Sequence, residues 1–275
     1  MVSVLMTAYN REKFIGFAIE SVLASSFSDW ELIIVDDVSR DRTVEIAKSY
    51  AEKDARVKVY LNEKNLGDYA NRNQAASYAQ GKYLKYVDAD DYIYPWGLEL
   101  MVQMMEQHPE AGWGLCSLPQ VVERPYPFVL DSREAFLNHY GGNEIFNKAP
   151  LSAILRQDAF RQVGGFSPLR MVGDFEMWHK MALHFPVLLM IDGIVWYREH
   201  GEQEMSSYRK FVRKYEEIRL QYLQHPKCPL SPAEVNTILK KRKRALLKLA
   251  FGNALRLRPA AARDSLKGWS FYVGK

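Results

Sequence analysis

The stretch Tyr86–Pro95 reads YVDADDYIYP and places Asp88, Asp90 and Asp91 directly after the apolar run 83–87. Three carboxylates this close together repel one another. A divalent cation would relieve the repulsion, because Mg²⁺ and Mn²⁺ prefer oxygen ligands and Mg²⁺ takes only one or two protein carboxylates. The alternative is a solvated turn in which an aspartate caps the next helix. The first interpretation predicts a metal site that a phosphate-bearing ligand completes at the end of a buried strand.

Strands and helices alternate along the chain up to this stretch. Continuous apolar or β-branched runs predict strands at 2–7, 31–35, 57–61 and 83–87. Apolar residues at helical spacing predict helices at 13–26, 43–53 and 69–80. The alternation predicts an α/β fold with a mixed, mostly parallel sheet flanked by helices. In such sheets ligands bind beyond the carboxyl ends of the strands.

Polar residues follow three of the predicted strands at the point where each ends. The three groups are Thr7-Ala8-Tyr9-Asn10, Asp36-Asp37 and Asp88-Ala89-Asp90. Parallel strands bring their carboxyl ends to one edge of the sheet, so the three groups should lie close together. The sequence therefore predicts one ligand site at this edge.

The remainder of the chain predicts a second half and a helical tail. Further strands are expected at 113–118, 151–155, 187–191 and 194–197, and helices at 95–107, 156–163 and 174–185, whereas 124–147 looks irregular. From residue 206 the pattern is helical, with proline-bearing breaks at 226–232 and 259. We expect a domain at 1–204, divided near residue 110, and a helical C-terminal extension at 205–275.

The C-terminal extension is strongly basic. Residues 1–200 carry 20 Lys and Arg against 27 Asp and Glu, whereas residues 201–275 carry 17 against 6. The run Lys240–Arg244 precedes the apolar stretch 245–251, a combination that suits a helix lying on an anionic membrane surface. The alternative is a helical bundle packed on the body or on a second subunit. Nucleic acid, which also attracts basic residues, is not expected as a partner.

Several other classes of protein are disfavoured. The two cysteines, Cys116 and Cys228, make no disulfide framework and favour a reducing compartment. The chain has neither a phosphate loop of the G-x-x-x-x-G-K-[ST] type nor a G-x-G-x-x-G fingerprint, which argues against an ATPase or a dehydrogenase. The sequence has no Cys and His spacing of the zinc-binding type. It also has no membrane-spanning run and no basic leader, so we expect a cytoplasmic protein that can also associate with the inner face of the membrane.

Together the motifs resemble the family-2 glycosyltransferases of the GT-A fold. The stretches that carry the resemblance are, in order, VSVLMTAYN, ELIIVDDVSRDRT, NLGDYANRNQA, YVDADDYIYP, VGGF and GDFEMW, and they cover residues 1 to about 200. The resemblance implies a Rossmann-like nucleotide-binding half at 1–110 and an acceptor-binding half at 111–204. It also implies inverting transfer of a sugar from a UDP-sugar to a carbohydrate or lipid-linked glycan, as in bacterial surface polysaccharide synthesis, with Mn²⁺ or Mg²⁺.

The resemblance assigns roles on the nucleotide side of the site. Asp37 would accept a hydrogen bond from the base, with Asp36 as the alternative one residue earlier. Asp90 would be the metal ligand, with His200 as a further metal contact. The other residues expected to contact the nucleotide, its ribose or its phosphates are Thr7, Ala8, Tyr9, Asn10, Arg72, Asp88 and Ala89, with Arg198 assigned to phosphate.

On the acceptor side the resemblance identifies Asp174, in GDFEMW, as the general base. The family often has Glu-Asp here, but this chain has Gly173 before the aspartate, and Glu176 is the competing base. Gly164 and Gly165 would form an acceptor-side loop, and Trp178 would either stack on sugar or pack in the core. A sugar nucleotidyltransferase and a non-catalytic sugar-binding module of the same fold are the alternatives to a transferase.

Overall fold

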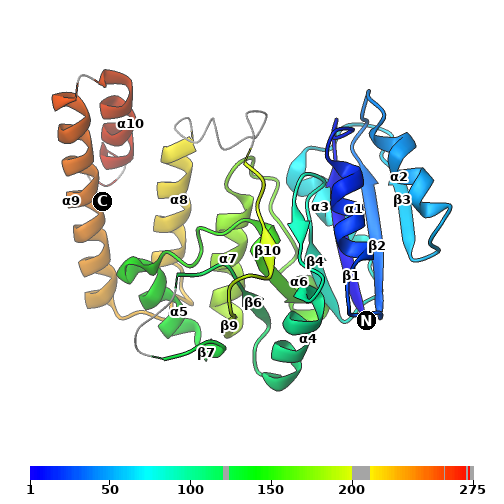
Figure 1. The fold of residues 1–275 in the computed structure, drawn as a ribbon. Helices are drawn as coiled ribbons and strands as arrows, with labels where there is room; N and C mark the ends of the chain where they lie inside the picture. Colours follow the sequence, from blue (N-terminus) through cyan, green and yellow to red (C-terminus); the bar gives the residue numbers. More distant parts are fainter. Residues whose placement is uncertain (120–123, 200–210, 257, 271, 273–275) are drawn as a thin grey trace.

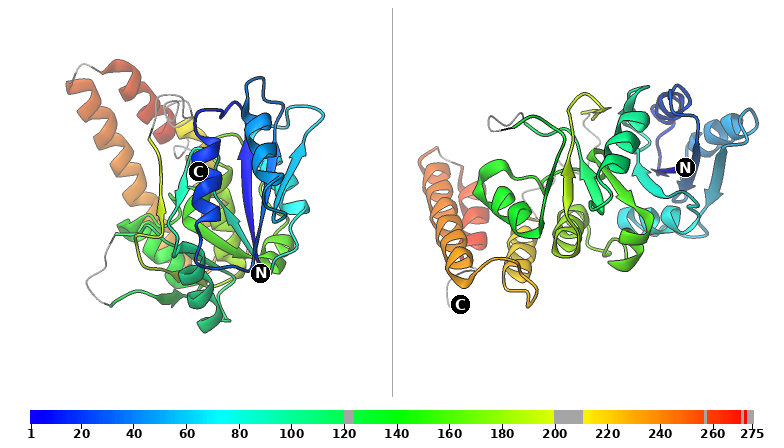
Figure 2. Two further views of the ribbon diagram at one scale, coloured as in Figure 1. Left: turned by 45° about the vertical axis from the view of Figure 1, so that its right-hand side comes forward. Right: turned by 90° about the horizontal axis from the view of Figure 1, so that it is seen from below.

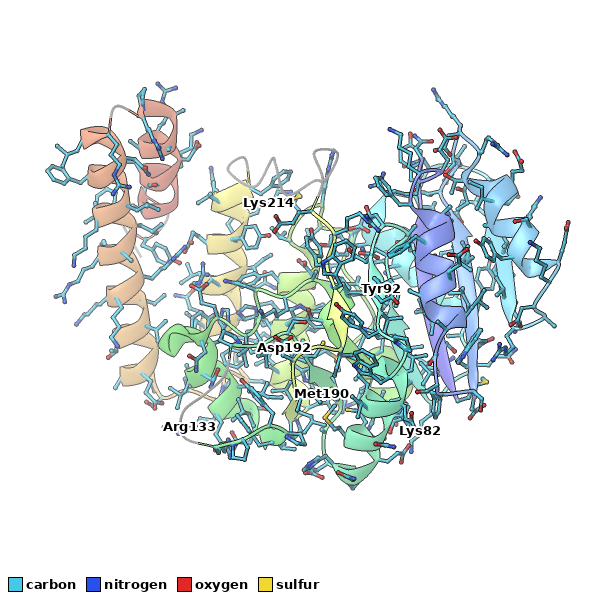
Figure 3. The ribbon with its side chains drawn as sticks, in the orientation of Figure 1. Lys82, Tyr92, Arg133, Met190, Asp192 and Lys214 are labelled. Atoms are coloured by element: carbon cyan, nitrogen blue, oxygen red, sulfur yellow. The ribbon has the colours of Figure 1, made fainter. Side chains whose placement is uncertain are left out.

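An eight-stranded sheet organises the molecule in the computed structural model, which describes residues 1–119, 124–199, 211–256, 258–270 and 272. In spatial order its strands are β3 (Val57–Leu61), β2 (Trp30–Asp36), β1 (Val2–Ala8), β4 (Tyr83–Tyr86), β8 (Ala153–Arg156), β6 (Trp113–Leu115), β9 (Val187–Leu189) and β7 (Phe128–Leu130). A second, two-stranded sheet pairs β10 (Val195–Trp196) with β5 (Tyr92–Ile93), where Trp196 lies opposite Tyr92, labelled in Figure 3. The predicted α/β fold with a mixed, mostly parallel sheet is confirmed.

The parallel half of the sheet sets the edge where the site forms. β1 pairs in parallel with both β2 and β4, and β2 pairs in parallel with β3. Ala8 lies opposite Asp36 in this register, and Leu5 lies opposite Tyr86. All seven residues of β2 are buried, as expected for a strand covered on both faces. The three polar groups of the sequence therefore leave the sheet along the same edge.

Helices cover both faces of the sheet (Figures 1 and 2). On one face lie α1 (Ile15–Leu23), α2 (Thr43–Ala51) and α4 (Gly97–Gln107), whose apolar residues form a core cluster with alternate residues of β1 and β2. The opposite face is covered by α3 (Asp68–Ser77), α5 (Ser132–Asn138), α6 (Gln157–Gln162), α7 (Gly173–His184) and α8 (Val212–Leu223). This alternation follows from the two-residue repeat of a strand, which sends neighbouring side chains to opposite faces.

The sequence predicts an irregular segment at 124–147, and this prediction is wrong. The segment contains β7, α5 and a π-helical turn, η1 (His139–Asn143). The start of α5 is fixed by a capping box. The Asp131 side chain accepts from the backbone N–H of Glu134, and the Glu134 side chain accepts from that of Asp131. Elements this short bury too few residues for an apolar repeat to show. A capping pair was the signal available in the sequence.

The C-terminal extension is helical, as predicted. After α8 come α9 (Pro232–Leu255) and α10 (Pro259–Ser270), which pack against each other at the end of the molecule farthest from β3 and α2 (Figure 1). A fully buried carboxylate, Glu216 of α8, joins them by accepting hydrogen bonds from Arg219, Arg242 of α9 and Tyr272. Within the described residues, the helices are all too short or too polar to cross a membrane.

A buried lysine ties the two halves of the sheet together. Lys85 of β4 is fully buried, and its ammonium donates hydrogen bonds to the carbonyl oxygens of Leu151 and Ala153. Burial lowers the pKa of this ammonium group to about 8. The bonds fix the 3₁₀ turn η2 (Pro150–Ser152), whose residues form part of the cavity described next.

Candidate active site

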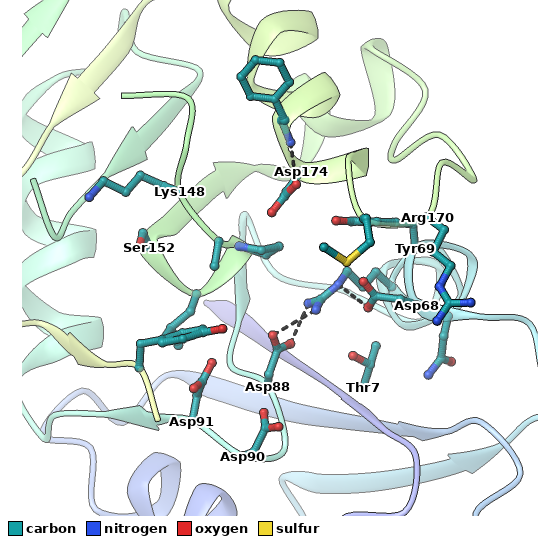
Figure 4. Close-up of a pocket in the computed structure, with 18 of the residues that line it drawn as sticks. Thr7, Asp68, Tyr69, Asp88, Asp90, Asp91, Lys148, Ser152, Arg170 and Asp174 are labelled. Carbon is teal, nitrogen blue, oxygen red and sulfur yellow. Dashed lines mark hydrogen bonds and ion pairs between the residues drawn. The ribbon is translucent and has the colours of Figure 1, made fainter. Parts of the chain in front are cut away.

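A large cavity opens at the carboxyl ends of β1, β2 and β4 and runs towards the C-terminal helices. Its volume is about 1530 Å³, beyond the roughly 300–1,000 Å³ of a pocket for one small molecule. Residues from both halves of the sheet and from α8 and α9 form its walls. Of the side chains expected at a site, the cavity gathers Thr7, Ala8, Tyr9, Asp37, Arg72, Asp88, Ala89, Asp90 and Asp174. Figure 4 shows Asp88, Asp90 and Asp91 on one side of this cavity and Asp174 across from them.

Asp37 faces the cavity and organises the loop beside it. Its carboxylate accepts hydrogen bonds from the side chain of Asn62 at 2.8 Å and from the backbone N–H groups of Leu66 and Gly67 at 2.8 and 2.9 Å. Gly67 has a φ of 81°, in the left-handed region that glycine tolerates best. The carboxylate thus holds the loop that leads into α3, which forms one wall of the cavity.

Two residues predicted to contact the nucleotide lie outside the cavity walls. Asp36 is buried and accepts a hydrogen bond from the N–H of Ser39 at 2.8 Å. Asn10 adopts a φ of 53°, and its side-chain oxygen accepts from the N–H of Arg40. Both shape the turns that follow β1 and β2. The sequence left open whether Asp36 or Asp37 contacts the nucleotide, and Asp37 is the one that faces the cavity.

Arg72 of α3 cross-links two acidic segments of the site. Its guanidinium makes a bidentate pair with Asp88, at 2.6 and 2.9 Å, and its Nε donates to Asp68 at 2.9 Å. The side chain of Arg72 is only 7% exposed and lies over the ring of Tyr86. A planar guanidinium suits two carboxylates at once, which a lysine could not match.

The remaining aspartates of the strand-end loop differ in environment. Asp90 accepts a hydrogen bond from Nε of Arg11 at 2.9 Å. Asp91 is buried, and its carboxylate accepts from the backbone N–H of Arg198 at 3.0 Å. Burial, followed by the negative charges of Asp88 and Asp90, raises the pKa of the Asp91 carboxyl well above its usual range. The negative charges of Asp88 and Asp90 are therefore close enough to disfavour ionisation of Asp91.

The donor set fits a divalent metal ion that is only partly held by protein. Among the described residues, no group of three or more His, Cys, Asp or Glu side chains is arranged to hold a metal ion. Carboxylate oxygens of Asp88 and Asp90 nevertheless face the cavity, and Mg²⁺ commonly takes one or two such ligands while phosphate oxygens and water supply the others. His200, predicted as a further ligand, lies outside the described residues.

Asp174 stands in the first turn of α7, with its carboxylate turned to the cavity (Figure 4). One carboxylate oxygen accepts from the N–H of Phe175 at 2.7 Å. Burial and the nearby charge of Asp68 raise the pKa of this carboxyl to about 6, against the opposing effects of the Phe175 N–H, Tyr69 and Arg72. A carboxylate with this pKa is a better proton acceptor than an ordinary aspartate and is still largely ionised near neutral pH.

The glycine before Asp174 has a steric reason. A Cβ atom on Gly173 would lie 2.7 Å from the ring of Tyr69, closer than any ordinary contact. Tyr69 is buried and lines the cavity beside Asp174. The Tyr69 ring therefore fills the space that a side chain at position 173, such as the glutamate expected from the resemblance, would need.

Several residues assigned to the acceptor or to phosphate lie away from the cavity. Trp178 is fully buried, stacks on Trp113 and donates to the carbonyl oxygen of Lys148, so its place is the core. Glu176 is buried and accepts from the hydroxyls of Ser167 and Tyr222.

The other residues of this group are equally displaced from the cavity walls. Gly164 and Gly165 line a separate, smaller hollow beside α3 and α6. Arg198 donates from Nε to the carbonyl oxygen of Asp90, and its guanidinium packs near the rings of Phe14, Phe17 and Trp196.

The cavity also contains residues that no sequence motif had singled out. Asp68 and Tyr69 belong to the stretch NLGDYANRNQA, and Arg11 follows the turn after β1. Others come from loops and from the C-terminal extension, among them Lys148, Arg170, Tyr215, Arg219 and Arg242. The only sequence signal of the four cationic residues among them was positive charge, which is common on any protein surface, and Tyr215 had no signal of its own.

The comparison with known families agrees with this geometry. The model described as "Glycosyl transferase family 2" matches residues 3–164, more than half of the chain. The chain belongs to glycosyl transferase family 2. The matched part contains the strand ends that line the nucleotide side of the cavity, and it ends before Asp174 and the C-terminal helices.

Individual relatives agree with this family assignment. The chain is 37% identical over 105 residues to the Escherichia coli UDP-Glc:alpha-D-GlcNAc-diphosphoundecaprenol beta-1,3-glucosyltransferase WfgD, a match that covers 38% of this chain and 41% of that protein. The chain spans less than two thirds of the length of the curated relatives that it matches.

Solved structures share the fold over nearly the whole chain. The crystal structure of S. aureus TarS 1–349 with UDP-GlcNAc has a TM-score of 0.67 at 20% identity and covers 98% of this chain and 89% of that one. The mannosyltransferase PcManGT from Pyrobaculum calidifontis, in complex with GDP-Man and Mn²⁺, has a TM-score of 0.64 at 16% identity and covers 99% and 87%. At these identities the likeness establishes the fold, here including the C-terminal helices.

Replacing Asp37 by asparagine should weaken UDP binding by about tenfold or more. The amide cannot accept from all three donors of the loop 62–67, and a lost hydrogen bond to a charged group costs roughly 1.5–3 kcal/mol. The matched control is Asp36→Asn, one residue earlier and outside the cavity, which should change UDP affinity by less than about threefold. Calorimetric titration with UDP measures both, and a larger loss in the Asp36 variant would reverse the assignment.

Proposed function

We propose that this protein is an inverting glycosyltransferase that moves a sugar from a UDP-sugar to a carbohydrate or lipid-linked glycan acceptor. The observation that carries the proposal is that Asp174 faces the same cavity as Asp37 and the Asp88–Asp91 loop. The carboxylate of Asp174, whose pKa is raised, thus lies across the cavity from the residues expected to bind the nucleotide and from the Asp88–Asp91 loop. Membership of family 2 supports the reaction type, and UDP-Glc and UDP-GlcNAc in the names of two relatives support a uridine nucleotide.

The reaction needs one proton transfer and one displacement at carbon. Asp174 takes the proton of an acceptor hydroxyl, and the hydroxyl oxygen bonds to the anomeric carbon from the face opposite the nucleotide. The bond between that carbon and the UDP oxygen breaks, and UDP leaves with the electron pair. Thr7, Ala8, Tyr9 and Asp37 would hold the nucleoside, and Arg72 keeps Asp88 in place.

A bound Mn²⁺ or Mg²⁺ would supply Lewis-acid stabilisation of the departing diphosphate. Asp90, supported by Asp88, would be its protein ligand. Asp90 is already paired with Arg11, so this arginine either shares the carboxylate with the metal or turns away from it. The complex of the distant PcManGT contains Mn²⁺, which supports a divalent metal ion in this role.

We propose that the chain divides by role along the boundaries that the sequence predicts. In this proposal 1–110 is the nucleotide-binding half, 111–204 the acceptor-binding half and 205–275 a helical extension that closes the cavity. A cytoplasmic location and a role in surface polysaccharide synthesis fit the intracellular supply of nucleotide sugars. A sugar nucleotidyltransferase or a non-catalytic module is disfavoured by the family assignment and by the placement of Asp174.

Asp174→Asn should abolish sugar transfer and leave UDP affinity within about twofold, because the amide keeps the size of the side chain but accepts no proton. Transfer is measured as UDP release and affinity by calorimetry, and Glu176→Gln is the matched control for the competing acid. Wild-type turnover in the Asp174 variant, or abolished turnover in a folded Glu176 variant, would remove Asp174 from this role.

The pH dependence of transfer should show an acid limb centred near pH 6. Asp174 must be ionised to accept a proton, so activity rises as pH passes its pKa of about 6 and then levels off. Asp68→Asn removes a negative charge that raises this pKa, so the limb should shift to lower pH in that variant. Initial rates at saturating donor from pH 4.5 to 8 measure the acid limb of the wild-type protein and that of the variant. An acid limb that does not shift in the variant would show that a group other than Asp174 titrates.

We further propose that the outward face of α9 contacts an anionic membrane surface. Leu247, Phe251 and Leu255 follow one another at helical spacing and are 40%, 68% and 69% exposed. Lys240 and Arg244 continue the same face towards the N-terminus of the helix, and both are exposed. A second copy of this face would bring like charges together, whereas anionic lipid would complement them.

Membrane contact predicts binding to vesicles that contain phosphatidylglycerol and little binding to pure phosphatidylcholine. Phe251→Ser should reduce the bound fraction several-fold in a sedimentation assay, because burial of the ring in the interface is lost. Leu61→Ser, a 52% exposed apolar residue at the opposite end of the molecule, is the matched control and should have no effect. Equal binding by the two variants would exclude this face.

A further inference from the structure

The turn that leads into α7 has an unusual backbone conformation at Met171. This residue has a φ of 70°, in the left-handed region that residues other than glycine rarely adopt. It is 7% exposed and lines the cavity shortly before Asp174. Within the described residues, no side chain caps the N-terminus of α7, whose N-cap residue is Val172. Such a conformation persists only where surrounding contacts hold it, so these contacts decide where α7 begins.

Tyr215 of α8 makes two of the contacts that hold this turn. Its hydroxyl donates to the carbonyl oxygen of Met171 at 2.8 Å. Its ring centre lies 5.1 Å from that of Phe175, at an interplanar angle of 58°. One contact comes before Asp174 in the chain and the other directly after it. Tyr215 and Met171 both line the cavity, so the hydrogen bond lies at the cavity wall.

Two further residues of α8 continue this contact along the same face of the helix. Arg219 and Tyr222 follow Tyr215 at a spacing of four and seven residues, which places all three on one side. The guanidinium of Arg219 lies 5.3 Å from the ring centre of Phe175, and the hydroxyl of Tyr222 donates to Glu176 at 2.6 Å. One face of α8 therefore contacts the residues on both sides of the proposed base.

The first turn of α7 is also held from the direction of α3. A Cβ atom on Gly173 would lie 2.7 Å from the ring of Tyr69, so this ring packs directly against the backbone of the turn. In Figure 1, α7 lies between α3 and α8. The start of α7 is thus confined on one side by Tyr69 and on the other by Tyr215.

The rest of the C-terminal extension fixes α8 itself. Glu216, the residue after Tyr215, is fully buried and accepts hydrogen bonds from Arg219 at 2.8 Å and from Nε of Arg242, on α9, at 3.0 Å. The Tyr272 hydroxyl donates to the same carboxylate at 2.5 Å. A displacement of α8 would break buried, charged hydrogen bonds, so Tyr215 is presented to the turn by a helix that is held in place.

We propose that Tyr215 is a positioning residue for Asp174, because its hydrogen bond to the carbonyl oxygen of Met171 holds the turn from which α7 starts. The inference rests on the proposed function in taking Asp174 as the base. A displacement of about 1 Å at a reacting group can cost roughly 10²-fold in rate. Since α8 lies outside the residues 3–164 that the family model matches, the C-terminal extension contributes to the geometry at the base as well as to the cavity wall.

Tyr215→Phe removes the hydroxyl and keeps the ring. We expect kcat for UDP release to fall about tenfold while the dissociation constant of UDP, from calorimetry, stays within about twofold. The donor is UDP-Glc or UDP-GlcNAc, whichever the wild-type protein turns over.

Two other measurements report on Asp174 directly. The N–H of Phe175 donates to the Asp174 carboxylate, so its hydrogen exchange, followed by NMR, should become several-fold faster in the variant. Burial is the main cause of the raised pKa of Asp174, so a loosened turn lowers this pKa and moves the acid limb of kcat to lower pH.

The matched control is Tyr140→Phe, which removes a tyrosine hydroxyl that lies 2.7 Å from Nε2 of His179, farther along α7 and outside the cavity walls. It should leave kcat, the acid limb and Phe175 exchange unchanged, even where it lowers the melting temperature. Equal changes in the two variants would therefore overturn the proposal, because loss of any hydrogen bond to α7 would then have the same effect.

Unchanged Phe175 exchange in the Tyr215 variant would also overturn the proposal, and so would weaker UDP binding, because Tyr215 would then serve the donor. Unchanged kcat in that variant, with Asp174→Asn inactive, would do the same. Full turnover by Asp174→Asn would instead contradict the proposed function. In that case Phe175 exchange still decides whether Tyr215 holds the turn.

Discussion

The ion pairs of Arg72 are the interaction on which the nucleotide side of the cavity depends. A single guanidinium, almost fully buried, binds Asp88 at the end of β4 and Asp68 at the start of α3. Without this positive charge, Asp88 would lose both of its charged hydrogen bonds, and its repulsion of the neighbouring carboxylates would be less well offset. The same contact fixes α3 against the sheet, so that Tyr69 stands beside Asp174. One ion-pair network thus sets both the acidic loop and the surroundings of the proposed base.

The sequence was sufficient to predict the nucleotide side because its strands are long, buried and parallel. Each ends in a polar group, and geometry alone brings such ends together, so Thr7, Asp37 and Asp88 were predictable. The acceptor side could not be predicted in the same way. Trp178 and Glu176 share the helix of Asp174, but both are buried by tertiary contacts, Trp178 against Trp113 and Glu176 in hydrogen bonds from Ser167 and Tyr222. No local pattern reveals which face of α7 meets the cavity, since that depends on how the helix packs.

The cavity combines two chemical environments that a single sheet edge would not supply. Parallel strands place acidic groups where a cation and a nucleotide can meet, whereas helices that follow later in the chain bring arginines to the opposite side. Asp174 stands between the two, and its raised pKa reflects both burial and the acidic neighbour Asp68. In the proposed reaction, the position of this one carboxylate decides which hydroxyl of an incoming molecule can react.

The separation of the cationic side chains from the family core has an evolutionary consequence. Arg219 and Arg242 lie on α8 and α9, outside the residues 3–164 that the family model matches, so they can diverge without altering the strands of the nucleotide half. Recombination that exchanges the last seventy or so residues between homologues would change the cavity wall formed by α8 and α9 while preserving the nucleotide half. Lineages that build different surface polymers could diversify by this route.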